Sequence, residues 1–176
     1  MTEPEVPAGK RERTKAANRA AILRAGAEVF AEMGYGAASV RDIVRRTDLA
    51  TGTFYNYFPD KESVLREILD GVAQQIRTRA RAARQRSTDL EGFVAGGYRA
   101  YYEVLAADRR LFELLRRNAG TIRAMFDEPA VFAGFEELQE DLRDAVAAGT
   151  LPDGIEVQYL TGAMIGAGFE IAVLML

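Results

Sequence analysis

The segment at residues 39–61, SVRDIVRRTDLATGTFYNYFPDK, constrains the fold of this chain more than any other stretch. Ser39 is a good N-cap, and apolar residues follow it at helical spacing, so the segment opens with a short helix. That helix is expected to end near Arg46. Thr47 and Asp48 favour local bonds between side chain and backbone, and Asp tolerates the left-handed conformation that a sharp turn uses.

A second short helix is expected from residue 50 or 51. Its inner side carries Phe54 and Phe58, and Pro59 ends it, because a proline disfavours helical geometry in the residue before it. The outer side carries hydroxyls, an amide, two phenols and a nearby lysine, namely Thr51, Thr53, Tyr55, Asn56, Tyr57 and Lys61. Such groups fit phosphates and base edges, and Gly52 allows close approach of the backbone. A small helical hairpin whose aromatics pack on the next helix is the alternative, and for Tyr57 alone it stays open.

The stretch GTFYNYFPDK resembles the DNA-binding domain of TetR-family transcriptional regulators, over roughly the first third of the chain. The resemblance implies a helix-turn-helix whose second helix reads DNA, with Tyr55, Tyr57 and Lys61 at the DNA backbone. Two positions depart from the family pattern. Asp48 stands where the turn usually has glycine, and Ala50 stands where a capping serine is common.

The expected fold class is all-α, since no strand pattern appears. Residues 1–13 mix Pro, Gly and charges without periodicity and are predicted to be a disordered leader. The family resemblance allows its basic residues Lys10, Arg11 and Arg13 to reach DNA, but a solvated tail is the interpretation that we favour. A helix is expected from Thr14, so the three-helix DNA-binding domain spans residues 14–59. Residues 60–176 are then a helical bundle for ligand binding and dimerisation.

The chain has no Cys, His or Trp. The lack of Cys excludes disulfides and thiolate sites, and the lack of His removes the commonest general base and metal ligand. No pair of the remaining reactive side chains has a productive spacing, so we expect neither an enzyme nor a metal or cofactor site. The first residues contain no apolar run, which favours a cytoplasmic protein.

Charge is divided unevenly along the chain. Residues 1–86 hold 16 Lys and Arg against 11 Asp and Glu, a net charge of +5, while residues 87–176 hold 7 against 15, a net charge of −8. A basic first half suits a polyanionic partner, and an acidic second half restricts DNA contact to one face.

A long helix capped by Asp60 is expected to link the two parts. Its basic second half (Arg77, Arg79, Arg81, Arg84, Arg86) is interpreted as a solvated face. The same interpretation is given to the acidic run that lies between residues 136 and 144 (Glu136, Glu137, Glu140, Asp141, Asp144).

The helices of the second part carry many aromatic residues on their apolar faces. Core packing accounts for any one of them, while the family resemblance implies a cavity among these helices. The candidates for its lining are Tyr98, Tyr101, Phe112, Met125, Phe126, Phe132 and Phe135. A small apolar or amphipathic effector is expected there.

The last helix, from about Ile155, carries glycines spaced by four, which let two helices approach closely. The candidate dimer interface is Gly162, Ile165, Gly166, Phe169 and Val173. Residues 160–176 number 17 and include Glu170, short of the ~20 apolar residues that a membrane span needs, so no membrane partner is expected. The resemblance implies a further helix, so we expect that the chain lacks its end.

One short recognition helix makes too little contact for specific binding, so a homodimer on an inverted repeat of double-stranded DNA is expected. The expected base readers are Thr51, Gly52, Thr53 and Asn56, with Arg41 at guanine, and the expected phosphate contacts are Ser39, Tyr55, Tyr57 and Lys61. Repression is implied by the resemblance. The alternative is a constitutive or architectural DNA-binding protein without ligand control.

Overall fold

The computed structural model describes residues 9–125 and 129–175. Its elements are α1 (Lys10–Met33), α2 (Val40–Val44), α3 (Thr51–Phe54), α4 (Lys61–Arg84), α5 (Leu90–Ala106), α6 (Arg109–Arg117), α7 (Ala119–Ala124), α8 (Pro129–Ala147) and α9 (Val157–Leu174). No strand occurs within these residues, and the predicted all-α fold class is confirmed.

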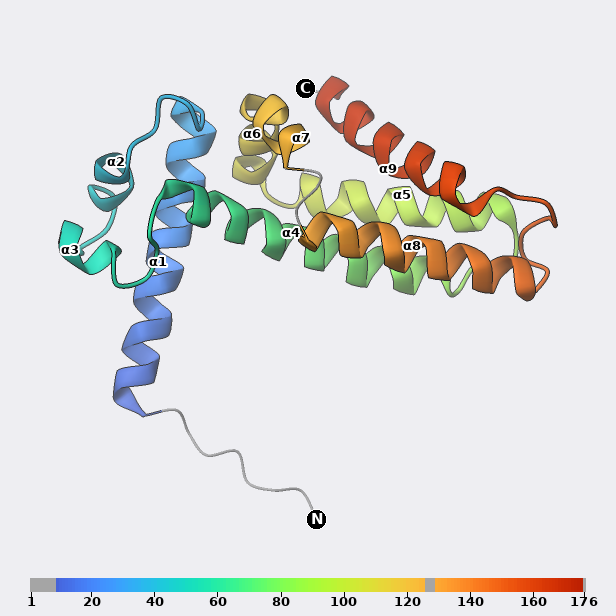
Figure 1. The fold of residues 1–176 in the computed structure, drawn as a ribbon, viewed down its shortest axis with the longest axis horizontal. Coiled ribbons are helices and arrows are strands. Elements are labelled where there is room, and N and C mark those ends of the chain that lie inside the picture. The colour runs from blue at the N-terminus through green and yellow to red at the C-terminus, as the bar shows by residue number, and fades with distance from the viewer. Residues whose placement is uncertain (1–8, 126–128, 176) are drawn as a thin grey trace, which may run out of the picture.

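The molecule has two parts joined by one helix (Figure 1). A small head, α1 to α3, is followed by α4, which runs from the head into a longer body, α5 to α9. α4 packs against α5 and α8 in the body and against α1 in the head. α1 also contacts α6, so the head and the body share a second boundary away from α4.

The head closes around one hydrophobic cluster, to which the start of α4 and the body residues Leu114, Ile122 and Phe169 also contribute. Phe54 and Phe58, which were predicted to point inward, are 0% and 2% exposed. α1 and α4 lie close together at Gly26, where a Cβ atom would stand 2.6 Å from Cγ1 of Val64. Any larger residue at Gly26 would push the two helices apart, so this glycine fixes how α4 leaves the head.

Side-chain caps begin α2, α4, α5 and α6, and the caps at Ser39 and Asp60 were predicted from the sequence. The Ser39 hydroxyl accepts a hydrogen bond from the Asp42 amide at 3.3 Å, and the Asp42 carboxylate accepts one from the Ser39 amide at 3.0 Å, which is a capping box. Asp60, Asp89 and Asp108 cap α4, α5 and α6 in the same way, each accepting from a backbone N–H two or three residues ahead.

The start of α1 differs from the prediction. The helix begins at Lys10 rather than at Thr14, so Arg11 and Arg13 lie on its first turn and not in a leader. The reason is composition: this stretch has no apolar periodicity, yet Lys, Arg, Glu and Ala are strong helix formers. Residues 1–8, the rest of the expected leader, lie outside the described residues.

The turn between α2 and α3 also differs in detail. No described residue other than glycine has a positive φ, so Asp48 does not take the left-handed conformation. The turn is instead held by Thr47, whose hydroxyl donates to the Val44 carbonyl at 2.9 Å and accepts from the Leu49 amide at 3.2 Å.

The basic row of α4 and the acidic run of α8 are not two solvated faces. Arg84 donates from Nε and Nη2 to one oxygen of Asp141, at 2.8 and 2.6 Å, and both side chains are buried. Nε of Arg81 lies 3.3 Å from the other Asp141 oxygen, and Nε of Arg77 lies 3.2 Å from Glu137. For these residues the interpretation was wrong, because helical spacing within each segment does not reveal that the two faces oppose each other. Arg79, Arg86, Glu136 and Asp144 are exposed, as the interpretation expected.

α9 is apolar on both of its sides. Thr161, Met164 and Phe169 are buried against the body, whereas Tyr159 and Leu174 are 76% and 80% exposed. By length and composition the helix could cross a membrane, a property that core helices of soluble proteins share. Its packing against α5 and α8 is that of a body helix.

Candidate nucleic-acid interface and internal cavity

The outer face of α3 and its turn is open. Thr51, Gly52, Tyr55 and Asn56 are exposed, while Thr53 is half-buried. No atom lies within 4 Å of the position that a Cβ on Gly52 would take, so another molecule can approach the backbone there. The face therefore has the hydroxyls, the amide and the exposed backbone that were expected of a groove-reading surface.

The two phenols of this segment occupy different environments. Tyr55 is 55% exposed, and only the edge of its ring contacts Phe54. Tyr57 is half-buried in the head, and its hydroxyl accepts a hydrogen bond from Nδ2 of Asn18 on α1 at 3.1 Å. Tyr57 thus fixes α1 against the turn, and its hydroxyl proton stays directed away from Asn18.

Lys61 is held by the loop that follows α1. Its ammonium donates to the backbone carbonyls of Tyr35 and Ala38 at 2.7 and 2.8 Å, and it lies 4.4 Å from the centre of the Tyr35 ring. An ammonium has three protons, so one is left for a phosphate after these two bonds. Lys61 is therefore positioned by the protein before any DNA arrives.

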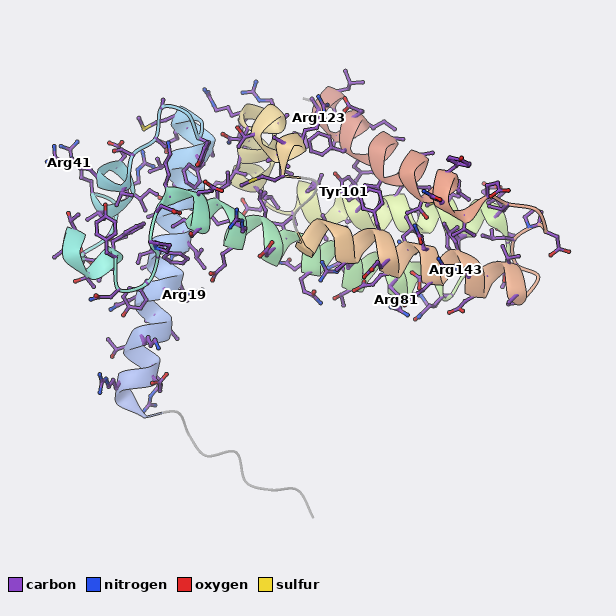
Figure 2. The ribbon with its side chains drawn as sticks, in the orientation of Figure 1. Arg19, Arg41, Arg81, Tyr101, Arg123 and Arg143 are labelled. Carbon is purple, nitrogen blue, oxygen red and sulfur yellow. The ribbon has the colours of Figure 1, made fainter. Side chains whose placement is uncertain are left out.

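The arginines around α2 divide into paired and unpaired groups. Arg46 forms ion pairs with Glu32 and Glu28 of α1. Arg41 and Arg45 are exposed and form no ion pair with the described residues. Figure 2 shows Arg41 at the outer edge of the head, pointing away from the body. Asp42 offsets part of this charge, so α2 and its C-cap keep one net positive charge beside the exposed Ser39.

The first turns of α1 add a basic wall to this surface. A surface hollow is lined by Arg11, Lys15, Asn56 and Tyr57, together with Glu12 and Thr14. The expected disordered leader hid this arrangement, because it kept Arg11 off the helix. The available signal was the spacing of Arg11 and Lys15, because residues four positions apart lie on the same face of a helix.

The body contains a cavity of about 220 Å³ among α4 to α9, which is partly open to the surface. Most of its lining is apolar: Leu69, Val72, Ala73, Ile76, Ala80, Gly97, Leu105, Leu115, Ile122, Met125, Gly134, Leu138, Met164, Ile165, Gly168 and Phe169. Its remaining lining side chains are Arg77, Arg84, Tyr98, Tyr101 and Glu137. Seven lining residues come from α4, which was predicted as a link between the two parts of the chain.

Three of the seven residues predicted for such a cavity line it, namely Tyr98, Tyr101 and Met125. Phe112 and Phe135 are half-buried elsewhere and do not line it, since α6 presents Leu115 to the cavity and α8 presents Gly134 and Leu138. The described residues do not include Phe126 or the side chain of Phe132. The aromatic content of a helix predicts that the helix has a buried side, but it does not show which side faces the cavity.

The residues predicted for a dimer interface lie on two sides of α9. Gly162 is exposed and Gly166 half-exposed, and both have open space where a side chain would be. Phe169 is buried in its own chain. Ile165 packs against a cluster in the body that includes Phe93 and Leu142, and Val173 packs against the cluster that fills the head. Of the five predicted residues, only Gly162 and Gly166 therefore lie on the outward side of the helix.

The family match lies in the head and at the start of α4. Residues 22–68 match the family described as bacterial regulatory proteins, tetR family. The fatty acid metabolism regulator protein of Bacillus subtilis (strain 168) is 25% identical over 151 residues, which cover 82% of this chain and 76% of that protein.

Solved structures share the whole architecture. A fatty acid degradation regulator, FadR from Bacillus halodurans, superposes with a TM-score of 0.76 at 23% identity, over 97% of this chain and 85% of that one. FadR from Bacillus subtilis, solved in complex with stearoyl-CoA, superposes with a TM-score of 0.75 at 22% identity, over 88% of this chain and 85% of that one. These similarities show the fold of the body as well as that of the head.

Proposed function

The chain belongs to the TetR family of bacterial transcriptional regulators, and we propose that it is a repressor which a ligand in the body cavity releases from DNA. Its DNA partner is an inverted-repeat operator, bound in the cytoplasm by two copies of the chain. The groove-reading surface is the exposed face of α3 with Arg41, and the phosphates are held by Ser39, Tyr55, Tyr57 and Lys61.

One observation carries this proposal: α4 belongs to both sites. Its first residue, Lys61, holds the loop between α1 and α2, and its next turns give the cavity Leu69, Val72, Ala73, Ile76, Arg77, Ala80 and Arg84. A ligand that fits the cavity in only one position of α4 favours the head position that goes with it. Because a ligand shifts an equilibrium by its differential affinity for the two states, DNA affinity falls when the favoured state no longer matches the operator.

The lining supports an amphipathic ligand with a long apolar part. Leu69, Leu105, Leu115 and Ile122 gather where α4, α5, α6 and α7 meet, whereas the charged lining residues come from α4 and α8. FadR from Bacillus subtilis was solved with stearoyl-CoA. We therefore propose a long-chain acyl-CoA as the ligand class, with the acyl chain in the cavity.

Dimerisation is proposed to use the outward side of α9. Tyr159, Gly162, Ala163 and Ala167 are exposed there, and the small residues leave a shallow strip on which a second α9 can lie. A dimer places two heads on one face of the DNA, which is the arrangement that an inverted repeat requires.

A selection from randomised DNA tests the proposal, followed by operator binding with and without stearoyl-CoA. A palindromic consensus and release by stearoyl-CoA are expected. A selection without a consensus would indicate an architectural DNA binder. A consensus whose affinity no acyl-CoA changes would indicate the constitutive alternative.

A further inference from the structure

Three tyrosines on α5 make different use of their hydroxyl groups. Tyr98 donates to the carbonyl of Met164 at 3.0 Å, and Tyr102 donates to the carbonyl of Gly168 at 3.3 Å. Both bonds tie α5 to α9. Tyr101, between them in sequence, has its ring edge-on to Tyr102 at 5.0 Å, but its hydroxyl makes no hydrogen bond with any described residue.

Tyr101 is distinct among the polar side chains that line the cavity. Arg84 is bonded to Asp141, Arg77 and Glu137 form an ion pair, and Tyr98 is bonded to α9. In the part of the chain that the structure describes, only Tyr101 therefore brings to the cavity a polar side-chain group without a protein partner.

The position of the Tyr101 ring is built into α9. A Cβ atom on Gly168 would lie 3.2 Å from Cε1 of Tyr98 and 3.9 Å from Cε1 of Tyr101, so the glycine makes room for both rings. Figure 2 shows Tyr101 inside the body, where α5, α8 and α9 surround it. Tyr101 is half-buried, so its hydroxyl can meet a ligand in the mostly apolar cavity, where a polar group without a hydrogen-bond partner is costly.

Burial raises the pKa of the Tyr101 hydroxyl above its ordinary value. The group consequently stays protonated throughout the physiological range and can donate a hydrogen bond. The cations that share the cavity, Arg77 and Arg84, are already paired with carboxylates. A carboxylate on the ligand would add a buried charge that these pairs do not neutralise, so a neutral acceptor fits better.

We propose that Tyr101 selects the ligand by donating a hydrogen bond to a neutral carbonyl oxygen that an otherwise apolar part of the ligand carries. This rests on the proposed function, since it concerns the ligand of the same cavity. Along α5 the lining residues are Gly97, Tyr98, Tyr101 and Leu105, so Tyr101 lies one helical turn from either end of this lining. A carbonyl held there lies within the length of the ligand rather than at its end, as the carbonyl of a long-chain thioester does.

The test compares stearoyl-CoA with S-octadecyl-CoA, the thioether that has methylene in place of the carbonyl. Calorimetric titration of the full chain should give a dissociation constant for the thioester about three- to tenfold lower than that for the thioether. Tyr101→Phe should bring the two constants together. Tyr102→Phe is the matched control, because that hydroxyl is bonded to α9 and lies outside the cavity lining, and it should keep the wild-type ratio.

A second pair of probes, undecan-2-one and undecane, removes the CoA moiety and is read by thermal stabilisation of the protein. The ketone should stabilise the wild-type chain more than the alkane does, and Tyr101→Phe should abolish the difference. An unchanged ratio in Tyr101→Phe overturns the role of Tyr101 while leaving the ligand class intact. If none of the four probes binds the wild-type chain, the proposed ligand class fails, and the selection by Tyr101 fails with it.

Discussion

The side chain of Asn118 holds the backbone of Tyr35 across the boundary between body and head. The Tyr35 amide donates to Oδ1 of Asn118 at 2.6 Å, and Nδ2 of Asn118 donates to the carbonyls of Phe30 and Leu114 at 3.1 and 2.7 Å. Asn118 is 3% exposed. One buried amide therefore joins the break between α6 and α7 to the end of α1.

Tyr35 is also held through its backbone carbonyl, which accepts a hydrogen bond from the Lys61 ammonium. Leu115 and Ile122, which line the cavity, stand three residues before and four residues after Asn118. A ligand that displaces either of them acts on the helix break that carries Asn118. The cavity thus has a second connection to the head, besides α4.

Replacing Asn118 should destabilise the protein, because its hydrogen bonds to Tyr35 and Phe30 are lost. Asn118→Ala leaves the Tyr35 amide and the Phe30 carbonyl without this partner in a buried place, at a cost of about 2–3 kcal/mol. Urea unfolding measures this cost. Asn56→Ala, at an exposed site, is the control and should change stability by less than about 0.5 kcal/mol. Equal midpoints for the two variants would show that the Asn118 bonds contribute little.

Lys61→Ala should affect both DNA affinity and the loop. The loss of one phosphate contact weakens binding to operator and to random DNA alike and reduces the slope of log affinity against log salt by about one unit. The freed carbonyls of Tyr35 and Ala38 should also make the loop exchange its amide protons faster. Arg66→Ala, on the same helix, is the control for lost charge. A loss confined to the operator would contradict a phosphate contact.

The buried pair of Arg84 and Asp141 should behave differently when one partner or both are changed. Arg84→Met alone leaves a buried carboxylate with less compensation and should cost about 3–5 kcal/mol. Adding Asp141→Leu removes that charge and should recover most of the loss. The three urea midpoints test this. A double variant as unstable as the single one would mean that the pair contributes through shape rather than charge.

The cap at Asp60 gives a pH-dependent contribution to stability. Hydrogen bonds from the backbone and side chain of Ser63 lower the pKa of Asp60 below its ordinary value of 3.8. A carboxyl whose pKa is lowered by folding stabilises the protein above its unfolded pKa, and this contribution is lost as pH falls through the folded pKa. Asp60→Ala should therefore cost about 1 kcal/mol at pH 7. The difference from the wild-type chain should shrink below pH 3.8, and a constant difference down to full protonation would argue against a charged cap.

Local features of this chain were predictable because their causes lie within a few residues. Ser39 with Asp42, and Asp60 with Ser63, are pairs three residues apart, and helical spacing alone places Phe54 inside the head. The same physics explains why the start of α1 was misplaced. Lys10 begins α1 because strong helix formers need no apolar stripe to continue a helix.

The long-range contacts were not predictable from spacing. Asn118 and Tyr35 are 83 residues apart, and Arg84 and Asp141 are 57 apart, so only the packing of the helices brings them together. Tyr98 and Tyr101 were both predicted lining residues, yet the sequence could not show that only Tyr101 has a hydroxyl without a protein partner among the described residues. That difference arises from the Met164 carbonyl, which α9 offers to Tyr98.

The outward side of α9 should control assembly. Ala163→Glu places a charge on the exposed strip beside Gly162, where a second α9 is proposed to lie, and a buried unpaired charge would disfavour that contact strongly. Sedimentation should show a shift from dimer toward monomer, and operator affinity should fall because each head then binds its half-site alone. Ala148→Glu, exposed after the end of α8, adds the same charge away from the strip and should leave the dimer intact. A stable dimer in Ala163→Glu would place the interface on another face of the body.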